Sequence, residues 1–315
     1  MSFAEILGHD RPLKVLRRAL ATGRVPHAYL FWGPDGVGKE AVARGTAGVL
    51  LCRDPEALPR AAACGACAAC RKAASASHAD LHLLAPAGAS IPIAEVRALQ
   101  EALGYRSFEG GRKVVIIRDA FRLTREASNA LLKTLEEPSD GTHLVLLAHH
   151  RNQLLPTLVS RCQSLRFDPI PEDAVRRLLE VGGVEPEAAR RMAQGAGGAP
   201  GAVWGQEPEA LAAVVDEVRQ VWSGWESASA AERFGRAAQW SGARGELGRR
   251  LDALEHLLTQ ELRQAARRSE AAAGTAAALG GLAQVRNLVE RNVNAELALG
   301  AFFLGALDRP WEEVL

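Results

Sequence analysis

The residues best suited to chemistry form an eight-residue segment, Gly-Pro-Asp-Gly-Val-Gly-Lys-Glu, at positions 33–40. It matches the phosphate-binding pattern G-x-x-x-x-G-K-[ST] at every fixed position except the last. Lys39 would reach the β and γ phosphate oxygens, while the glycines let backbone N–H groups turn toward the phosphates. These glycines are Gly33, Gly36 and Gly38. The last position normally supplies a hydroxyl to Mg²⁺ and Glu40 has none, so we predict a nucleotide cradle with a damaged metal site.

A second chemical signal is the group of four cysteines Cys52, Cys64, Cys67 and Cys70, with the spacing C-x11-C-x2-C-x2-C. Two overlapping C-x2-C turns bring three thiolates within reach of one ion, and Cys52 can complete a tetrahedron. Four thiolates leave no position for water, so the pattern predicts a structural Zn²⁺. Zinc contributes about 10–16 kcal/mol of apparent folding energy in small modules. That is enough to order an Ala-rich insertion at about 52–70.

Other interpretations of these ligand types remain open. The cysteines could be unligated thiols or could hold an iron–sulfur cluster, although the spacing favours zinc. His78 follows the cysteines and could replace one of them as a ligand. His149 and His150 are adjacent and would point in different directions on a strand, which disfavours a metal pair.

Composition sets limits on the class of protein. The chain has 315 residues, of which 48% are hydrophobic and 24% charged, as in ordinary globular proteins of two or three domains. Its formal charge of +1 gives no overall attraction to nucleic acid, so any DNA contact must come from a local basic patch. We find no apolar run of the ~20 residues that a membrane span needs, and charged residues interrupt the N-terminus early. We therefore expect a cytoplasmic protein with no membrane association, whose cysteines do not form disulfides.

Hydrophobic patterning predicts the elements that position these residues. Continuous apolar runs of the kind found in parallel sheets covered on both faces predict strands at 28–32, 81–84, 113–117, 144–148 and 163–167. Helical spacing predicts helices at 6–21, 40–51, 93–103 and 125–137, with Thr124 as the N-cap of the last. Pro169 and Pro171 then mark a boundary, and the pattern is helical from about 207 to the end. The fold class is α/β, a parallel-sheet domain followed by helical parts.

The strand at 113–117 does not end as an ATPase requires. In a P-loop ATPase this strand ends in Asp-Glu, where the Asp supports Mg²⁺ and the Glu polarises water. Here it is followed by Arg118-Asp119, so a cation stands at the metal-supporting position. This is a second missing catalytic part.

Several motifs, taken in order, resemble the delta-prime family of clamp-loader subunits of bacterial DNA polymerase III, which are AAA+ proteins. The resemblance covers essentially the whole chain. The matching segments are 27–31 leading into the loop at 33–39, the four cysteines, the segment 129–138 and Ser160-Arg161-Cys162.

The resemblance implies three parts: an AAA+ domain at 1–168 with the zinc insertion, a helical lid at 169–206 and a helical collar at 207–315 that joins subunits. It implies a pentameric loader with gamma/tau and delta subunits as partners, which places a sliding clamp on primer-template DNA. Arg161 would be an arginine finger that reaches a neighbour's ATP site, because a fixed guanidinium can neutralise charge on the γ-phosphate. Lys133 would contact the DNA backbone without sequence preference.

The departures from an active ATPase agree with one another. They are Glu40, the Arg118-Asp119 pair, histidines 149 and 150 at the sensor position, and a segment 197–201 without arginine. We therefore expect a subunit without intrinsic ATPase, in which ATP or ADP binds weakly if at all. The alternatives are an ATP-hydrolysing gamma/tau-type subunit, and a stand-alone zinc-containing nucleic-acid-binding protein.

Overall fold

The chain divides into two compact units, Met1–Ala174 and Val175–Leu315. A computed structural model describes residues 3, 6–109, 111–206, 208–225, 227–242, 244–268, 272–290 and 293–305. The sequence-based division into an AAA+ domain, a lid and a collar remains a prediction. Residues 306–315, also expected to be helical, lie outside the described residues.

The first unit is built on a five-stranded sheet with the order β2-β3-β4-β1-β5. All of its described pairings are parallel. The strands are β1 (Ala28–Trp32), β2 (Leu81–Leu84), β3 (Lys113–Ile117), β4 (Thr142–Ala148) and β5 (Gln163–Arg166). Every residue of β3 is buried, which explains its uninterrupted apolar sequence. The predicted parallel α/β sheet is confirmed, with β4 beginning two residues earlier and β5 ending one residue earlier than expected.

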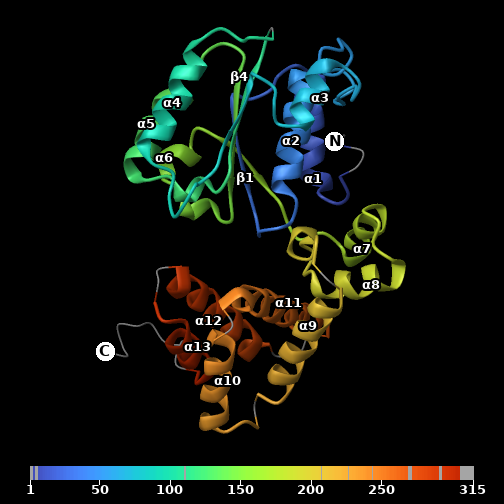
Figure 1. The fold of residues 1–315 in the computed structure, drawn as a ribbon, viewed down its shortest axis with the longest axis vertical. Helices are drawn as coiled ribbons and strands as arrows, with labels where there is room; N and C mark the ends of the chain where they lie inside the picture. Colours follow the sequence, from blue (N-terminus) through green and yellow to red (C-terminus); the bar gives the residue numbers. More distant parts are fainter. Residues whose placement is uncertain are drawn as a thin grey trace. The chain divides into compact units, whose positions relative to one another are not determined.

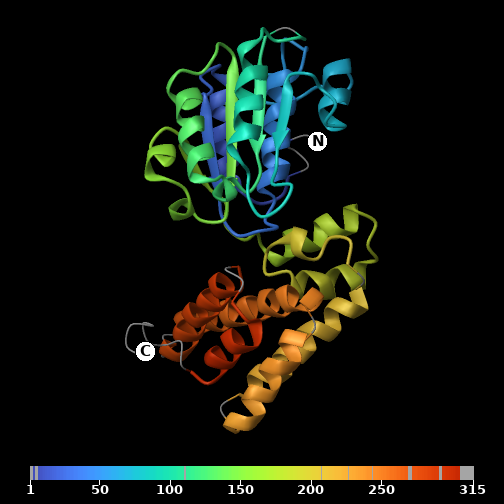
Figure 2. The ribbon, with the colours of Figure 1, turned by 60° about the vertical axis from the view of Figure 1, so that its left-hand side comes forward.

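Helices cover both faces of this sheet. The helices α1 (Asp10–Ala21), α2 (Lys39–Leu51) and α3 (Ala68–Ala74) lie on one side in Figure 1, and α4 (Ile93–Gly104), α5 (Arg125–Glu136) and α6 (Pro156–Val159) lie on the other. Figure 2 turns the view so that α4 and α5 come in front of the sheet. Short 3₁₀ turns, Ala120–Arg122 and Arg151–Gln153, follow β3 and β4. Parallel strands carry their loops to a common edge, and the P-loop is one of these loops.

Local sequence sets where two of these helices begin. Thr124 accepts a bond from the N–H of Ala127 and caps α5, as predicted. The helix predicted from residue 6 begins instead at Asp10. This prediction was wrong because Gly8 and His9 adopt positive φ angles of 73° and 57°, which a helix cannot contain. A side chain at position 8 would also collide with Ile170.

Every element in the described part of the second unit is helical. Its elements are α7 (Glu172–Val181, which begins in the first unit), α8 (Pro186–Gly195), the 3₁₀ turn Pro200–Ala202, α9 (Pro208–Ser223), α10 (Ala230–Gly242), α11 (Arg244–Arg268), α12 (Ala273–Glu290) and α13 (Ala295–Phe303). Its core gathers Trp240, Leu254, Leu258 and Phe303, each almost completely buried. Burial of large apolar side chains of this kind contributes about 1.5–3 kcal/mol each.

Candidate functional site

The P-loop connects β1 to α2 and depends on glycine at its two ends. Gly33 has φ 152°, and a Cβ there would lie 1.9 Å from the carbonyl oxygen of Phe167. Gly38 has φ 106° and forms the N-cap of α2, where no side-chain oxygen caps the helix. Free N–H groups at a helix start favour an anion. The loop therefore has the backbone of a phosphate cradle, with Gly36 also at positive φ between the two ends.

Lys39 is bonded to its own loop. Its Nζ donates to the carbonyl oxygens of Gly33 at 2.7 Å and of Pro34 at 2.6 Å. The residue is 7% exposed. Burial lowers the pKa of Lys39 to about 8, while the carboxylates of Asp35 and Asp119 act in the opposite direction. These contacts hold the ammonium group of Lys39 against the carbonyl oxygens of the loop, and its role in binding phosphate stays a prediction.

Glu40 makes two charged contacts at the start of α2. Its Oε1 accepts a bond from Nε of Arg44, one helical turn later, at 2.8 Å. Its Oε2 lies 3.7 Å from Nη1 of Arg118, the residue that follows β3. Both partners of the second pair are partly exposed. The two residues that replace the expected metal-binding groups therefore lie together and carry opposite charges.

The end of β4 contributes a histidine to the same edge. Nε2 of His149 lies 3.9 Å from Oδ1 of Asp35 and 4.0 Å from Oδ1 of Asp119. Its ring centroid lies 4.8 Å from that of Phe121. Asp119 itself has φ 47°, a left-handed conformation that aspartate tolerates. The edge therefore brings one histidine ring near two carboxylates.

A magnesium–nucleotide complex does not fit this arrangement. Mg²⁺ needs oxygen ligands in a nearly octahedral array. At this edge the carboxylate of Glu40 already contacts two guanidinium groups, Arg44 and Arg118. A dication would have to displace them and would then lie beside their positive charge.

The cysteine cluster fits a zinc ion. Its four Sγ atoms, from Cys52, Cys64, Cys67 and Cys70, lie within 4.8 Å of one another. Among the described residues, no other group of three or more potential ligand side chains could hold a metal. Backbone N–H groups of residues 64, 67 and 70 point at cluster sulfurs at 3.4 Å. Such donors stabilise thiolates, which are the form that binds Zn²⁺. Four thiolates at this spacing suit tetrahedral structural zinc.

Cys67 carries the clearest electrostatic sign of this environment. Burial opposes ionisation, but N–H groups of Arg53 and Cys70 and the neighbouring thiols outweigh it and lower the pKa of Cys67 to about 6. The fifth cysteine, Cys162, lies outside the cluster, and burial raises its pKa to about 12. Within the cluster, burial also raises the pKa of Cys70 to about 12, so Cys162 is distinguished by its position outside the group of four and not by its pKa.

One carboxylate ties the cysteine module to the sheet domain. Glu109 lies in the loop before β3, with its Oε1 2.7 Å from Nζ of Lys72 in α3. Its Oε2 lies 3.4 Å from Arg53 and 3.7 Å from the buried ring of His78. Lys72 holds the pKa of Glu109 below its usual value. His78, weighed as a substitute zinc ligand, is therefore placed against Glu109, outside the group of four cysteines.

Arg161 follows α6 at the surface of the first unit. Its Nη2 lies 2.6 Å from Oε1 of Glu136, near the end of α5. Its Nη1 donates to the carbonyl oxygen of Thr157 at 3.0 Å. The side chain is 36% exposed, so the guanidinium is both oriented and accessible.

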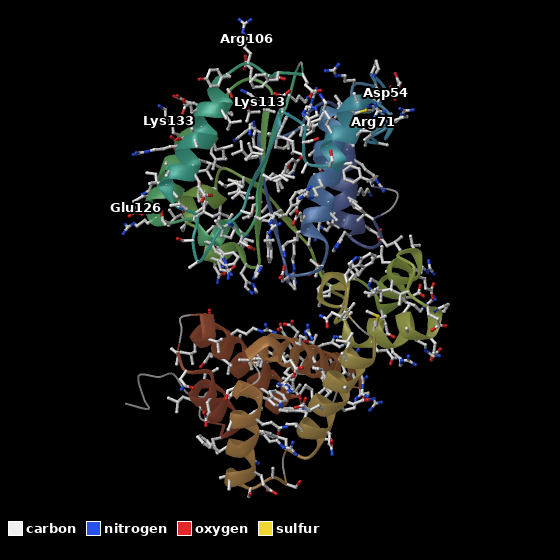
Figure 3. The ribbon with its side chains drawn as sticks, viewed as in Figure 1. Asp54, Arg71, Arg106, Lys113, Glu126 and Lys133 are labelled. Carbon is white, nitrogen blue, oxygen red and sulfur yellow. The ribbon has the colours of Figure 1, made fainter. Side chains whose placement is uncertain are left out.

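Lys133 lies on the exposed face of α5. Figure 3 draws it, with Glu126, pointing away from the sheet. An exposed lysine on this face can make a phosphate contact, although its position also suits a solvated residue.

His9, Glu109 and Glu136 also belong to these sites, although no sequence pattern identifies them. His9 Nε2 lies 2.7 Å from the carbonyl oxygen of Val37 in the P-loop, and its ring packs edge-on against Phe167. Each of the three contacts a residue that is distant in the chain, and no local pattern identifies such a partner. The Gly-His pair before α1 could have indicated an unusual turn, but it did not indicate that His9 contacts the P-loop.

The strand order, the loop after β1 and the helices on both faces define a P-loop domain of the AAA+ class. The family described as "DNA polymerase III, delta subunit" matches residues 8–171, which is more than half of the chain. The chain belongs to this family.

Curated relatives agree with this assignment. DNA polymerase III subunit delta' of Bacillus subtilis is 39% identical over 183 residues, which cover 58% of this chain and 54% of that protein. Subunit delta' of Pseudomonas aeruginosa is 40% identical over 184 residues, covering 53% and 55%. Subunit tau of Escherichia coli is 34% identical over 179 residues, covering 57% and 27%. The chain spans about half the length of the delta' relatives it matches.

Two similar solved structures come from Thermotoga maritima. A gamma-subunit-related protein of DNA polymerase III has a TM-score of 0.43 at 20% identity and covers 94% of this chain and 99% of its own. A single-residue variant of RuvB has a TM-score of 0.46 at 19% identity and covers 70% and 66%. Among the described residues, no helix has the length and apolar character to cross a membrane.

Proposed function

We propose that this chain is a non-hydrolysing subunit of a replicative clamp loader, working beside ATP-hydrolysing subunits that place a sliding clamp on primed DNA. Membership of the delta-subunit family supports the assembly. The observation that carries the non-hydrolysing part is the Glu40–Arg118 ion pair at the metal position. A site without Mg²⁺ lacks the ion that neutralises charge on the transferred phosphoryl group.

Arg161 is the proposed arginine finger of this subunit. Its guanidinium is accessible and fixed at two points, by Glu136 and Thr157. The γ-phosphate of ATP bound to a neighbouring subunit would compete with the carboxylate of Glu136 for the guanidinium of Arg161. Fingers supplied in trans are worth about 10³–10⁵ in rate in GTPases. The proposed partners are gamma/tau and delta subunits, with the sliding clamp and primer-template DNA reached through the assembly.

Zn²⁺ on the four cysteines is the proposed structural cofactor, and it has no chemical step. When bound it would join the end of α2, at Cys52, to the start of α3, at Cys67. ATP or ADP, if it occupies the P-loop, is a weak structural ligand and not a substrate.

The second unit, which begins at Val175, is proposed to contain the collar, 207–315, and all of the lid, 169–206, except its first six residues. Large apolar side chains remain exposed at its C-terminal end, notably Leu297 at 61%, with Val293 and Leu304 nearby in the chain. Such side chains suit contacts with other subunits.

Lys133 is proposed to contact the phosphate backbone of the template DNA. Because a clamp loader acts on chromosomal DNA, the proposed location is the cytoplasm.

An ATP-hydrolysing subunit is the alternative favoured by the similarity to tau. It requires the metal site that Arg118 occupies. The stand-alone zinc protein is less suited to the near-neutral charge of the chain.

ATP turnover separates these proposals. We expect the isolated chain to show none with Mg²⁺ and DNA. A loader rebuilt with gamma/tau and delta should hydrolyse ATP faster with the chain than without it. Turnover by the isolated chain, abolished by Lys39→Ala, would establish the ATPase alternative instead.

A further inference from the structure

The start of α2 and the end of β3 are joined by charge where a P-loop enzyme holds a metal. Glu40 stands at the last position of the P-loop pattern, and Arg118 directly follows β3. The two residues are distant in the chain and meet because α2 packs on β3. Nη1 of Arg118 comes within 3.7 Å of Oε2 of Glu40.

The two residue changes compensate for each other. A metal site presents a hydroxyl on the helix and a carboxylate after the strand to one dication. Here the carboxylate lies on the helix, and the strand end supplies the cation. Together the two changes place opposite charges side by side and so restore an attraction between the helix and the strand end. Arg44 adds a second guanidinium to the same carboxylate.

The remaining charges of the cradle are also held internally. Lys39 donates to two loop carbonyls, and Nε2 of His149 lies 3.9 Å from Asp35 and 4.0 Å from Asp119. The loop therefore keeps its shape through contacts made within the chain.

We propose that the Glu40–Arg118 pair is a built-in replacement for the divalent cation, which fastens α2 to the end of β3 and keeps Mg²⁺ out of the cradle. This inference deepens the proposed non-hydrolysing role and rests on it for its biological meaning. The ion pair itself can be tested on the isolated chain.

Removal of the built-in cation should create a place for a real one. In Arg118→Asp, a carboxylate replaces the guanidinium beside Glu40 and is followed by the carboxylate of Asp119. Attraction becomes repulsion, and the partly exposed pair should cost roughly 2–4 °C in melting temperature. Mg²⁺ alone, added at millimolar concentration, should restore at least half of this loss. The wild-type chain should change by less than about 1 °C on the same addition.

The experiment needs a charge-matched control and a buffer without chelators. A chelator would also attack the cysteine cluster, so Mg²⁺-free buffer is prepared by dialysis. The control is Arg125→Asp, an exposed residue at the start of α5 on the opposite side of the sheet from α2. It has the same change in charge and should show no response to Mg²⁺. If Arg118→Asp does not fold, Arg118→Ser removes the cation with less repulsion and should show a smaller response in the same direction.

Three results would overturn the inference. The first is a wild-type chain stabilised by Mg²⁺ as much as the variant. The second is an Arg118→Asp chain as stable as wild type and indifferent to Mg²⁺. The third is an equal response of Arg125→Asp. None of them involves the assembled loader, so failure here is distinct from failure of the proposed function, which is decided by ATP turnover.

Discussion

The guanidinium of Arg161 lies 2.6 Å from the carboxylate of Glu136. This contact gives the proposed finger a resting position on α5 of its own chain. It also means that engagement of a neighbour's phosphate requires the ion pair to break. Both side chains are partly exposed, so the pair is a weak one and can be exchanged.

Glu136→Gln should release the finger at little cost in stability. The free energy of unfolding of the isolated chain should change by less than about 1 kcal/mol. In a rebuilt loader, ATP turnover at limiting concentrations of this chain should rise, because no pair must break on assembly. Glu137→Gln, the next exposed acid, is the control. If ATP turnover falls at saturating concentrations of the Glu136→Gln chain, Glu136 instead positions the finger for catalysis.

The zinc content of the chain should depend on the four cysteines of the cluster and not on Cys162. Wild-type chain should contain one equivalent of zinc, and Cys67→Ala should lose most of it and melt at a lower temperature. Cys162→Ala, which changes the cysteine outside the cluster, should keep its zinc. Metal analysis of the purified chains measures this directly. Full zinc occupancy in Cys67→Ala would remove that residue from the ligand set.

The buried lysine predicts a pH dependence of stability. Its pKa is about 8 in the folded chain and 10.5 in the reference state. Between these values the unfolded chain binds more protons at this site, so Lys39 makes the folded state relatively more stable as pH rises from about 8 toward about 10. Below about pH 8 its desolvation penalty is constant. Lys39→Met should lack this rise in the free energy of unfolding. Denaturant unfolding of the wild-type and variant chains across this pH range measures the difference, because the other groups titrate in both chains.

Lys133→Ala should weaken DNA binding by the assembled loader to a similar extent for every sequence. A lost phosphate contact lowers the slope of log K against log salt by about 0.9. Lys14→Ala is the matched control, because Lys14 is exposed on α1, on the other side of the sheet. An unchanged salt slope would identify Lys133 as a solvated residue.

Local patterns predicted the parts of the fold that depend on neighbouring residues. The run of apolar residues predicted β3, Thr124 predicted the start of α5, and the spacing of the cysteines predicted their cluster. The start of α1 was predicted wrongly because Gly8 and His9 both adopt left-handed conformations, which the helical spacing of the apolar residues does not reveal.

Contacts between distant segments were outside the reach of these patterns. The sequence showed that Glu40 replaces the expected hydroxyl and that Arg118 replaces the expected carboxylate of a metal site. It did not show that the two side chains contact each other. Their pairing depends on α2 lying across β3, and the contact of Arg161 with Glu136 depends on α6 lying beside α5. Such relationships arise from sheet order and helix packing.

The chain is proposed to stimulate a neighbour's ATP hydrolysis without hydrolysing ATP itself. The most direct measurement is DNA-dependent ATP turnover of the rebuilt loader with wild-type chain, Arg161→Ala or Arg161→Lys, with assembly checked by gel filtration. We predict that Arg161→Ala lowers turnover at least about tenfold, that Arg161→Lys recovers little because lysine lacks the planar fork, and that both variants assemble normally. Full turnover with assembled Arg161→Ala loader would contradict the account.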